Sequence, residues 1–272
     1  EMQQWFEQFK STFTVPPRDV VEVRKWDGTV KDVNGTHCQF GTVLRVCSCR
    51  TKSGYPVPVW LHGAPGAGKT HLGQQIAEAL ELPYYPVPMG PTSTESKLVG
   101  FNNLLAGKYI EGLLYRPFKN GGVTLIDEVT VGDPSVLIAI NSLSSNTSYR
   151  FPNGELVERH KDFILICADN TVGTGSKGGF VRNKLDAATL DRFVMIEFTY
   201  DPHLEDQLCG NETWSRYVQK VREFVRSNCQ DSIYISPRAS INGAALLRDG
   251  LHPTFVSDCT LFKLCSPSIK QN

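Results

Sequence analysis

One eight-residue segment constrains the fold of this chain more than any other feature. Residues 63–70 read GAPGAGKT and fit the pattern GxxxxGK[ST]. An extended apolar run at residues 57–61 precedes the segment, and a helix-like run at residues 72–80 follows it. Strand, glycine-rich turn and helix are the parts of a phosphate-binding loop, in which backbone N–H groups and the start of a helix surround phosphate oxygens. Because the flanking runs fit, this interpretation is favoured over a chance glycine-rich turn.

The motif also predicts which residues contact a nucleotide. Lys69 would neutralise charge on the β- and γ-phosphates, and the Thr70 hydroxyl would ligate Mg²⁺. We expect the loop and the first turn of the helix to form the nucleotide contacts through Gly63, Ala64, Pro65, Gly66, Ala67, Gly68, Lys69, Thr70 and His71.

A second motif follows at domain-scale separation. Residues 122–128 read GVTLIDE, an apolar run that ends in two acids and is typical of a buried parallel strand. Ligands of open α/β sheets bind at the carboxyl ends of the strands. Asp127 would therefore hold the Mg²⁺ shell, and Glu128 would polarise the water that attacks the γ-phosphate. The alternative is a strand that ends in a solvated turn, and the upstream loop favours the nucleotide site.

Composition narrows the classes of protein. With 272 residues and 40% hydrophobic content, the chain is long enough for one large domain or a core with a small appendage. Lys plus Arg (28) balance Asp plus Glu (28), so no global basic field indicates nucleic acid. No apolar run approaches the ~20 residues of a membrane span. The chain begins with Glu1 rather than an initiator methionine, and we expect further residues upstream.

The cysteines indicate reduced thiols. Eight are spread along the chain without a paired framework, which favours a cytoplasmic setting. Cys167 lies in an apolar strand and is expected to be buried. Zinc binding is one interpretation of four residues that are close in sequence: His37, Cys38, Cys47 and Cys49. The group contains no CxxC pair, so structural thiols are favoured.

Three segments of different pattern are expected. Residues 1–36 would form an N-terminal extension with a helix and a hairpin, 37–200 an α/β core, and 201–272 a small helical lid. Strands alternating with helices indicate a parallel sheet, and the later helices alone indicate the lid. Three prolines in the run at 82–89 predict an edge strand, because proline removes ladder donors. The predicted strands of the core sheet are residues 57–61, 82–89, 122–127, 163–168 and 194–198.

Three further polar residues are candidates for contacts with a bound nucleotide. Asn170 follows a strand beside the acidic pair, where its amide would position water; the alternative is a turn-forming asparagine. Arg192 is a candidate finger for the γ-phosphate of a neighbouring subunit; the alternative is a surface salt bridge. Arg238 follows Ser236-Pro237 at a helix start and would reach phosphate as the lid closes; the alternative is a solvated first-turn arginine.

The order of these motifs resembles the AAA+ ATPases over about residues 55–250. The inserted hairpin at 99–110 and the hairpin at 149–160 look like those of the MoxR, helix-2-insert group, and residues 185–193 are similar to that group's finger segment. Residues 168–184 look most like the ATPase subunit of cobaltochelatase (CobS) and its phage-borne relatives. The N-terminal hairpin at 20–33 matches no part of that pattern, and the lid is short.

The resemblance implies a P-loop NTPase (AAA+) with a five-stranded parallel sheet and a C-terminal helical lid. It implies ATP and Mg²⁺ as cofactors, Asn170 as sensor 1, Arg192 as the trans finger and Arg238 as sensor 2, in cis or in trans. It also implies a homo-oligomeric, usually hexameric ring, with the two hairpins near its pore and a von Willebrand-type partner in a separate chain.

Three functions remain open at this stage. The preferred one is an ATP-driven motor that remodels a protein client. A nucleic-acid-dependent ATPase shares the same chemistry, but only Lys108, Arg150 and Arg159 flank the hairpin tips, which ranks it second. A scaffold that binds ATP without turnover is the third, and the intact acidic pair argues against it.

Overall fold

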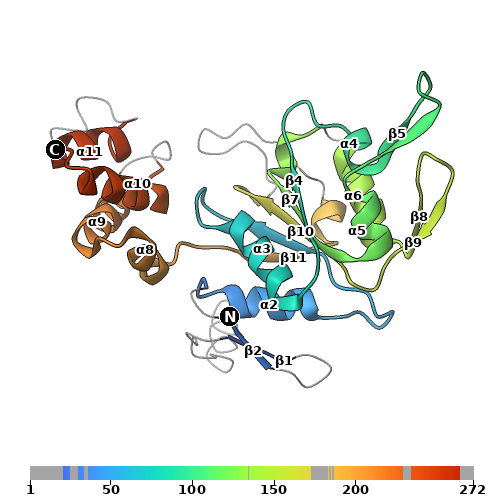
Figure 1. Cartoon of the computed structure of the whole chain (residues 1–272), viewed down its shortest axis with the longest axis horizontal. Helices are drawn as coiled ribbons and strands as arrows, with labels where there is room; N and C mark the ends of the chain where they lie inside the picture. The colour runs from blue at the N-terminus through green and yellow to red at the C-terminus, as the bar shows by residue number, and fades with distance from the viewer. Residues whose placement is uncertain are drawn as a thin grey trace, which may run out of the picture.

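The computed structural model describes residues 21–24, 30–33, 36–133, 135–172, 183, 185, 187–228 and 234–263 (Figure 1). The predicted helix within residues 1–14 lies outside these residues. The N-terminal hairpin is confirmed, because β1 (Val21–Arg24) pairs antiparallel with β2 (Val30–Val33).

A parallel sheet forms the centre of the core, as predicted. Its order is β11-β3-β10-β7-β4, and every pairing within it is parallel. The proline-rich strand lies at an edge, where its missing N–H groups cost no ladder bond. The strands are β3 (Val59–His62), β4 (Tyr84–Pro88), β7 (Gly122–Asp127), β10 (Phe163–Asp169) and β11 (Val194–Glu197).

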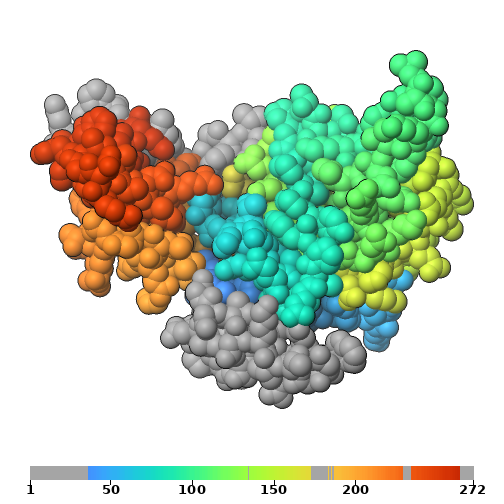
Figure 2. All heavy atoms as spheres, viewed as in Figure 1, coloured from blue at the N-terminus to red at the C-terminus, as the bar shows by residue number. Residues whose placement is uncertain are grey.

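Two hairpins project from the core on the side away from the lid (Figure 1, Figure 2). The first pairs β5 (Gly100–Asn103) with β6 (Lys108–Glu111), and the second pairs β8 (Ser148–Arg150) with β9 (Leu156–Glu158). Asn102 Nδ2 donates to Pro152 O at 2.7 Å and so joins the two hairpins. Both predicted insertions are therefore present, and they form one projecting unit.

The helical lid follows β11. Its helices are α8 (Pro202–Cys209), α9 (Glu212–Asn228), α10 (Pro237–Arg248) and α11 (Pro253–Thr260). They bury a cluster of their own that includes Trp214, Val218 and Val256. A buried ion pair adds to it: Arg222 contacts both carboxylate oxygens of Glu205 at 2.7 and 2.6 Å. Among the described residues, no helix combines the length and apolar character that a bilayer crossing requires.

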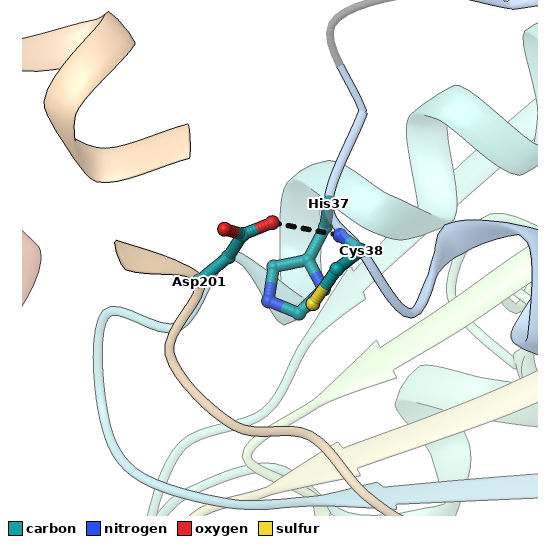
Figure 3. A group of neighbouring side chains, drawn as sticks. All are labelled: His37, Cys38 and Asp201. Carbon is teal, nitrogen blue, oxygen red and sulfur yellow. Dashed lines mark hydrogen bonds between the residues drawn. The ribbon is translucent and has the colours of Figure 1, made fainter. Parts of the chain in front are cut away.

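The cysteine-rich segment does not form the four-residue zinc cluster that the sequence raised. It becomes α2 (Phe40–Ser48), where Cys47 is fully buried in the core while Cys49 is exposed. Only His37 and Cys38 of that set lie together, and their third neighbour is Asp201 from the linker to the lid (Figure 3). This agrees with the favoured interpretation as structural thiols, because α2 packs against the sheet and takes Cys47 inward.

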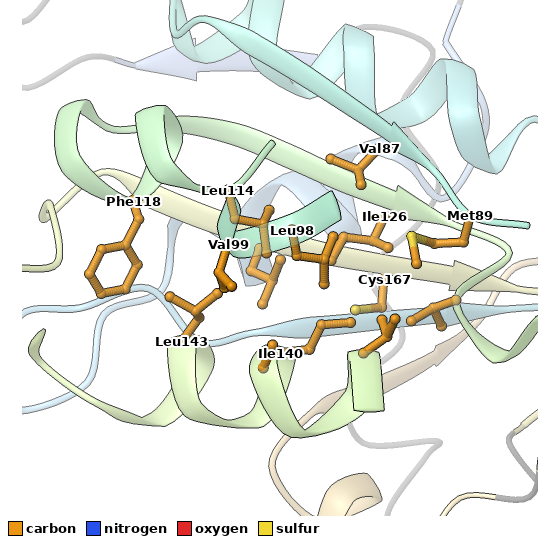
Figure 4. Packing of buried hydrophobic residues seen from close by; sticks show 14 of the residues in the cluster. Val87, Met89, Leu98, Val99, Leu114, Phe118, Ile126, Ile140, Leu143 and Cys167 are labelled. Atoms are coloured by element: carbon orange, nitrogen blue, oxygen red, sulfur yellow. The ribbon is translucent and has the colours of Figure 1, made fainter. Parts of the chain in front are cut away.

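Successive side chains of each strand point to opposite faces of the sheet, and each face carries its own buried cluster. On one face α2 and α3 (Lys69–Leu80) cover residues such as Leu61 and Ile166. On the other face α4 (Glu95–Val99), α5 (Tyr115–Asn120) and α6 (Ser135–Ser145) cover residues such as Ile126 and Cys167 (Figure 4). Cys167 is fully buried, as predicted. Burial on both faces explains the near-continuous apolar runs of the strands and fixes where each strand ends.

Candidate nucleotide-binding site

The glycine-rich loop connects β3 to α3, as the motif predicts. Gly68 stands at the N-cap of α3 with φ +98°, a left-handed conformation that glycine adopts without steric cost. A Cβ on Gly63 would lie 2.0 Å from Phe198 O, so only glycine fits beside β11 there. A Cβ on Gly68 would meet no atom within 4 Å, which shows open space over the loop at this point. There is therefore open space beside Gly68 at a helix N-terminus, where anions bind.

Lys69 is held in the middle of this loop. Its side chain is buried, and Nζ donates to Gly63 O at 2.7 Å, Ala64 O at 3.1 Å and Asn170 Oδ1 at 3.0 Å. Burial lowers the pKa of Lys69 to about 8, and neighbouring carboxylates only partly counter this effect. An ammonium that gains a negative partner in such a place recovers the lost solvation.

The acidic strand end lies beside the loop. Thr70 Oγ1 donates to Asp127 Oδ2 at 2.5 Å, and Asp127 Oδ1 accepts the Glu128 N–H at 3.0 Å. Glu128 is exposed and has φ +55°, an uncommon conformation for a residue with a side chain. A hydroxyl and a carboxylate oxygen side by side are hard donors, and they fit Mg²⁺, which takes few protein ligands alongside phosphate and water.

Asp169 is a site residue that sequence reasoning missed. It is 1% exposed, and its carboxylate accepts from Thr130 N at 3.0 Å and Thr130 Oγ1 at 2.5 Å. Its other oxygen accepts from Thr171 N at 3.0 Å. Asp169 thus ties the end of β10 to the turn that follows Glu128. The Asp-Asn pair at a strand end was the available signal, and only its second member was singled out.

Arg238 approaches the loop of its own chain. It lies in the first turn of α10 and is among the charges that lower the pKa of Lys69. With Pro65 it lines a cavity of about 250 Å³ between the loop and the lid. A Cβ on Gly66 would lie 2.9 Å from Ser236 Cβ, so the lid touches the loop. Ser236 occupies the N-cap position with Pro237 at N1, but its side chain makes no capping hydrogen bond.

Arg192 is placed differently. It is exposed, and its guanidinium donates to Ala188 O in the preceding turn, just before the edge strand β11. The structure therefore brings Lys69, Thr70, Asp127 and Asn170 together with Arg238 nearby, and leaves Arg192 facing solvent.

The remaining predicted positions are less informative. His71 is exposed at the third residue of α3, where the structure shows no role for it. Lys108 and Arg150 are exposed on the hairpins. Arg159 is 6% exposed and donates to Ser144 O and Pro56 O, so it is a structural residue.

Tyr200 is a second contact that the sequence did not indicate. Its hydroxyl donates to Pro65 O at 2.9 Å, and the Arg222 guanidinium lies 4.6 Å from its ring centroid. Since Arg222 pairs with Glu205 inside the lid, Tyr200 connects the loop to the ion pair of the lid. Nothing local in the sequence marks this role, because it depends on the position of the linker.

A glycine-rich loop on a parallel sheet, with a buried lysine and a Thr–Asp pair, defines a P-loop nucleotide-binding protein. The family model described as AAA domain (dynein-related subfamily) matches residues 58–193, and the chain belongs to this family. Curated relatives are similar to most of the chain. The denitrification regulatory protein NirQ of Pseudomonas aeruginosa is 28% identical over 72% of this chain and 78% of its own length. Protein NorQ of Paracoccus denitrificans is 25% identical over 72% of this chain and 75% of its own length.

A solved structure of a candidate ATPase from Cytophaga hutchinsonii is 20% identical, with a TM-score of 0.46. The match covers 77% of this chain and 58% of that one.

Proposed function

We propose that this chain is an ATP-hydrolysing motor that assembles into a ring and remodels a protein client. One observation carries the proposal. Lys69 bonds two loop carbonyls and Asn170 at once, while Thr70 and Asp127 lie side by side at the adjacent strand end. A phosphate-neutralising cation, a pair of metal ligands and a water-positioning amide thus converge on one edge of the sheet.

The chemistry follows from this arrangement. Bound Mg²⁺, held through Thr70 and Asp127, supplies charge neutralisation for the β- and γ-phosphates of ATP. Lys69 exchanges its carbonyl partners for phosphate oxygens, which compensates its burial. Asn170 accepts from Lys69 through Oδ1, and its amide N–H groups are then able to orient the attacking water. Glu128 polarises that water as it attacks the γ-phosphate.

Assembly completes the site in this proposal. Arg238 of the same chain faces the loop, whereas Arg192 is exposed beside an edge strand. A solvent-exposed guanidinium beside an edge strand is suited to the γ-phosphate of an adjoining copy. Such a finger is worth ~10³–10⁵ in rate in systems where it has been measured. We therefore propose a closed homo-oligomer, with six copies as in the family it resembles.

The projecting hairpins support a polypeptide client. Leu104 and Leu105 at the tip of the first hairpin are 91% and 102% exposed, and only Lys108 adds positive charge there. Contact with nucleic acid needs several cations that neutralise phosphates, and burial of Arg159 removes one candidate. From the resemblance to the MoxR group, we propose that the client is a protein or a protein complex, with a von Willebrand-type chain as one candidate partner.

A turnover assay tests the proposal. Wild-type protein should release phosphate from ATP, with a specific rate that rises with protein concentration because the site needs two copies. Glu128→Gln should keep ATP binding, lose at least about 100-fold in turnover, and lock assemblies. The exposed acid Glu158, on the second hairpin, offers a matched control, since Glu158→Gln should hydrolyse normally.

Two outcomes would contradict parts of the proposal. A specific rate that does not depend on protein concentration would contradict completion of the site by a second copy. Strong stimulation by nucleic acid that falls with salt would replace the protein client with a nucleic-acid one.

A further inference from the structure

Three metal-ligating side chains meet where the core joins the lid. His37 and Cys38 precede α2, and Asp201 lies in the linker between β11 and α8. Their ligand atoms all lie within 4.8 Å of one another. We propose that His37 Nδ1, Cys38 Sγ and a carboxylate oxygen of Asp201 form a site for a zinc-class metal ion, with solvent water as the fourth ligand. This site is separate from the ATP site and does not depend on its function.

The separations suit a tetrahedral ion. With Zn–N near 2.0 Å and Zn–S near 2.3 Å, tetrahedral ligands stand about 3.5 Å apart. His37 Nδ1 and Cys38 Sγ are 3.8 Å apart. The carboxylate of Asp201 reaches toward them from the opposite side, as Figure 3 shows, and accepts from Cys38 N at 2.7 Å. Small side-chain rotations therefore suffice to close the site.

The imidazole of His37 is already oriented for this role. Nε2 lies 2.9 Å from Thr199 O. Because a carbonyl only accepts, Nε2 carries the proton and Nδ1 keeps its lone pair. Metal-binding histidines are typically fixed in this way, with the other ring N–H on a backbone carbonyl. Nδ1 now accepts from Gln39 N at 3.1 Å. A metal ion would replace that bond, and partly exposed Gln39 has water available for its N–H.

Asp201 retains the capacity for a metal ligand. Its Oδ1 accepts from His203 N and Leu204 N, each at 3.1 Å, and so caps α8. Its Oδ2 accepts from Cys38 N at 2.7 Å, and the Cys38 thiol is a further hydrogen-bond partner of this carboxylate, a bond that loss of the thiol proton on metal binding would remove. A carboxylate oxygen has two lone-pair sites, so Oδ2 is able to bind a cation as well. A metal ion held here would tie the first residues of the lid to the start of α2.

The donor set selects the class of metal. One thiolate, one imidazole and one carboxylate suit Zn²⁺, whereas Mg²⁺ and Ca²⁺ take oxygen ligands. The Mg²⁺ that accompanies ATP is thus a poor competitor. His37 is buried, but Cys38 is exposed, so an ion has access from solvent. Binding would release the thiol proton of Cys38, as it does for thiolate ligands in general.

Cobalt provides a direct test, because Co²⁺ replaces zinc and reports thiolate ligation through a near-ultraviolet charge-transfer band. The full chain, without nucleotide and with excess Mg²⁺, is titrated with Co²⁺ and then with Zn²⁺. We expect a band that saturates at one Co²⁺ per chain and disappears when Zn²⁺ displaces the cobalt.

Matched variants identify the cysteine that gives rise to the charge-transfer band. Cys38→Ser should abolish it, and Cys49→Ser, which changes another exposed cysteine, should leave it intact. Asp201→Asn keeps a capping side chain for α8 and should weaken Co²⁺ binding at least ~10-fold. Mutation of a residue that only hydrogen-bonds to a metal ligand typically weakens binding by about 10- to 100-fold, so loss of a ligand should cost no less. No band in the wild type, or a band that survives in Cys38→Ser, would overturn the proposal while leaving the ATPase proposal untouched.

Discussion

The lowered pKa of Lys69 makes a quantitative prediction about ATP affinity. Burial of the ammonium is the largest cause of the shift to about 8, with a smaller contribution from the positive charge of Arg238. A bound triphosphate places negative charge at the same ammonium and should return its pKa toward 10. Nucleotide binding should therefore require the protonated form of Lys69 and take up a proton when the pH is near or above 8.

The magnitude follows from the protonated fraction of the free protein. With a pKa of about 8, roughly nine-tenths of the Lys69 side chains are charged at pH 7, half at pH 8 and a tenth at pH 9. If only the charged form binds, the Kd for ATP should increase about 10-fold from pH 7 to pH 9, with uptake of about half a proton per ATP at pH 8.

Calorimetry with a non-hydrolysable ATP analogue measures both quantities. Titrations at pH 8 in two buffers of different ionisation enthalpy give the number of protons taken up, and a pH series gives Kd. Lys69→Arg is the matched control, because a guanidinium remains charged throughout this range. Whatever the absolute affinity of the Lys69→Arg variant for the ATP analogue, its Kd should stay constant with pH. Equal affinity of the wild type at pH 7 and pH 9, with no proton uptake, would refute this account of Lys69.

Three further substitutions test the lid and its contact with the loop. Glu205→Ala leaves the guanidinium of Arg222 without its carboxylate inside the lid and should cost about 3–5 kcal/mol in the free energy of unfolding, measured with urea. Gly243→Ala places a Cβ 2.3 Å from Nε1 of Trp214 and should cost about 1–3 kcal/mol, which tryptophan fluorescence during unfolding would detect. Tyr200→Phe removes one hydrogen bond to the loop and should cost about 1 kcal/mol of stability, with a weaker ATP affinity. A neutral result would contradict the contact that Glu205→Ala or Tyr200→Phe removes, or the close packing that Gly243→Ala disturbs.

Much of the core was accessible from the sequence because its signals are local. The loop at 63–70 needs glycine where φ is positive, and the strand ending in Asp127 needs apolar residues on both faces, so both motifs carry their own structural requirement. The prolines of β4 likewise fixed that strand at an edge. The hairpin at 149–160 was predictable from its Pro-Asn-Gly turn at 152–154, and the hairpin at 99–110 from resemblance alone.

The features that escaped prediction depend on contacts between distant segments. Asp169 gains its role from Thr130, 39 residues earlier. Tyr200 meets Pro65 across 135 residues. The favoured interpretation of the cysteines as structural thiols holds for Cys47, which α2 takes into the core, but the approach of Asp201 to His37 and Cys38 comes from a part of the chain that spacing does not reveal. Periodicity and motif spacing describe neighbours along the chain, whereas these contacts join segments that are far apart in the sequence.

Complementation between two inactive variants tests the central claim most directly. Arg192→Ala lacks the finger, and Glu128→Gln lacks the group that activates water. If ATP lies at a seam between copies, an equal mixture that exchanges subunits should recover hydrolysis at about a quarter of the seams, where an intact Glu128 meets an intact Arg192. A mixture that assembles but stays as inactive as either variant alone would contradict the shared site.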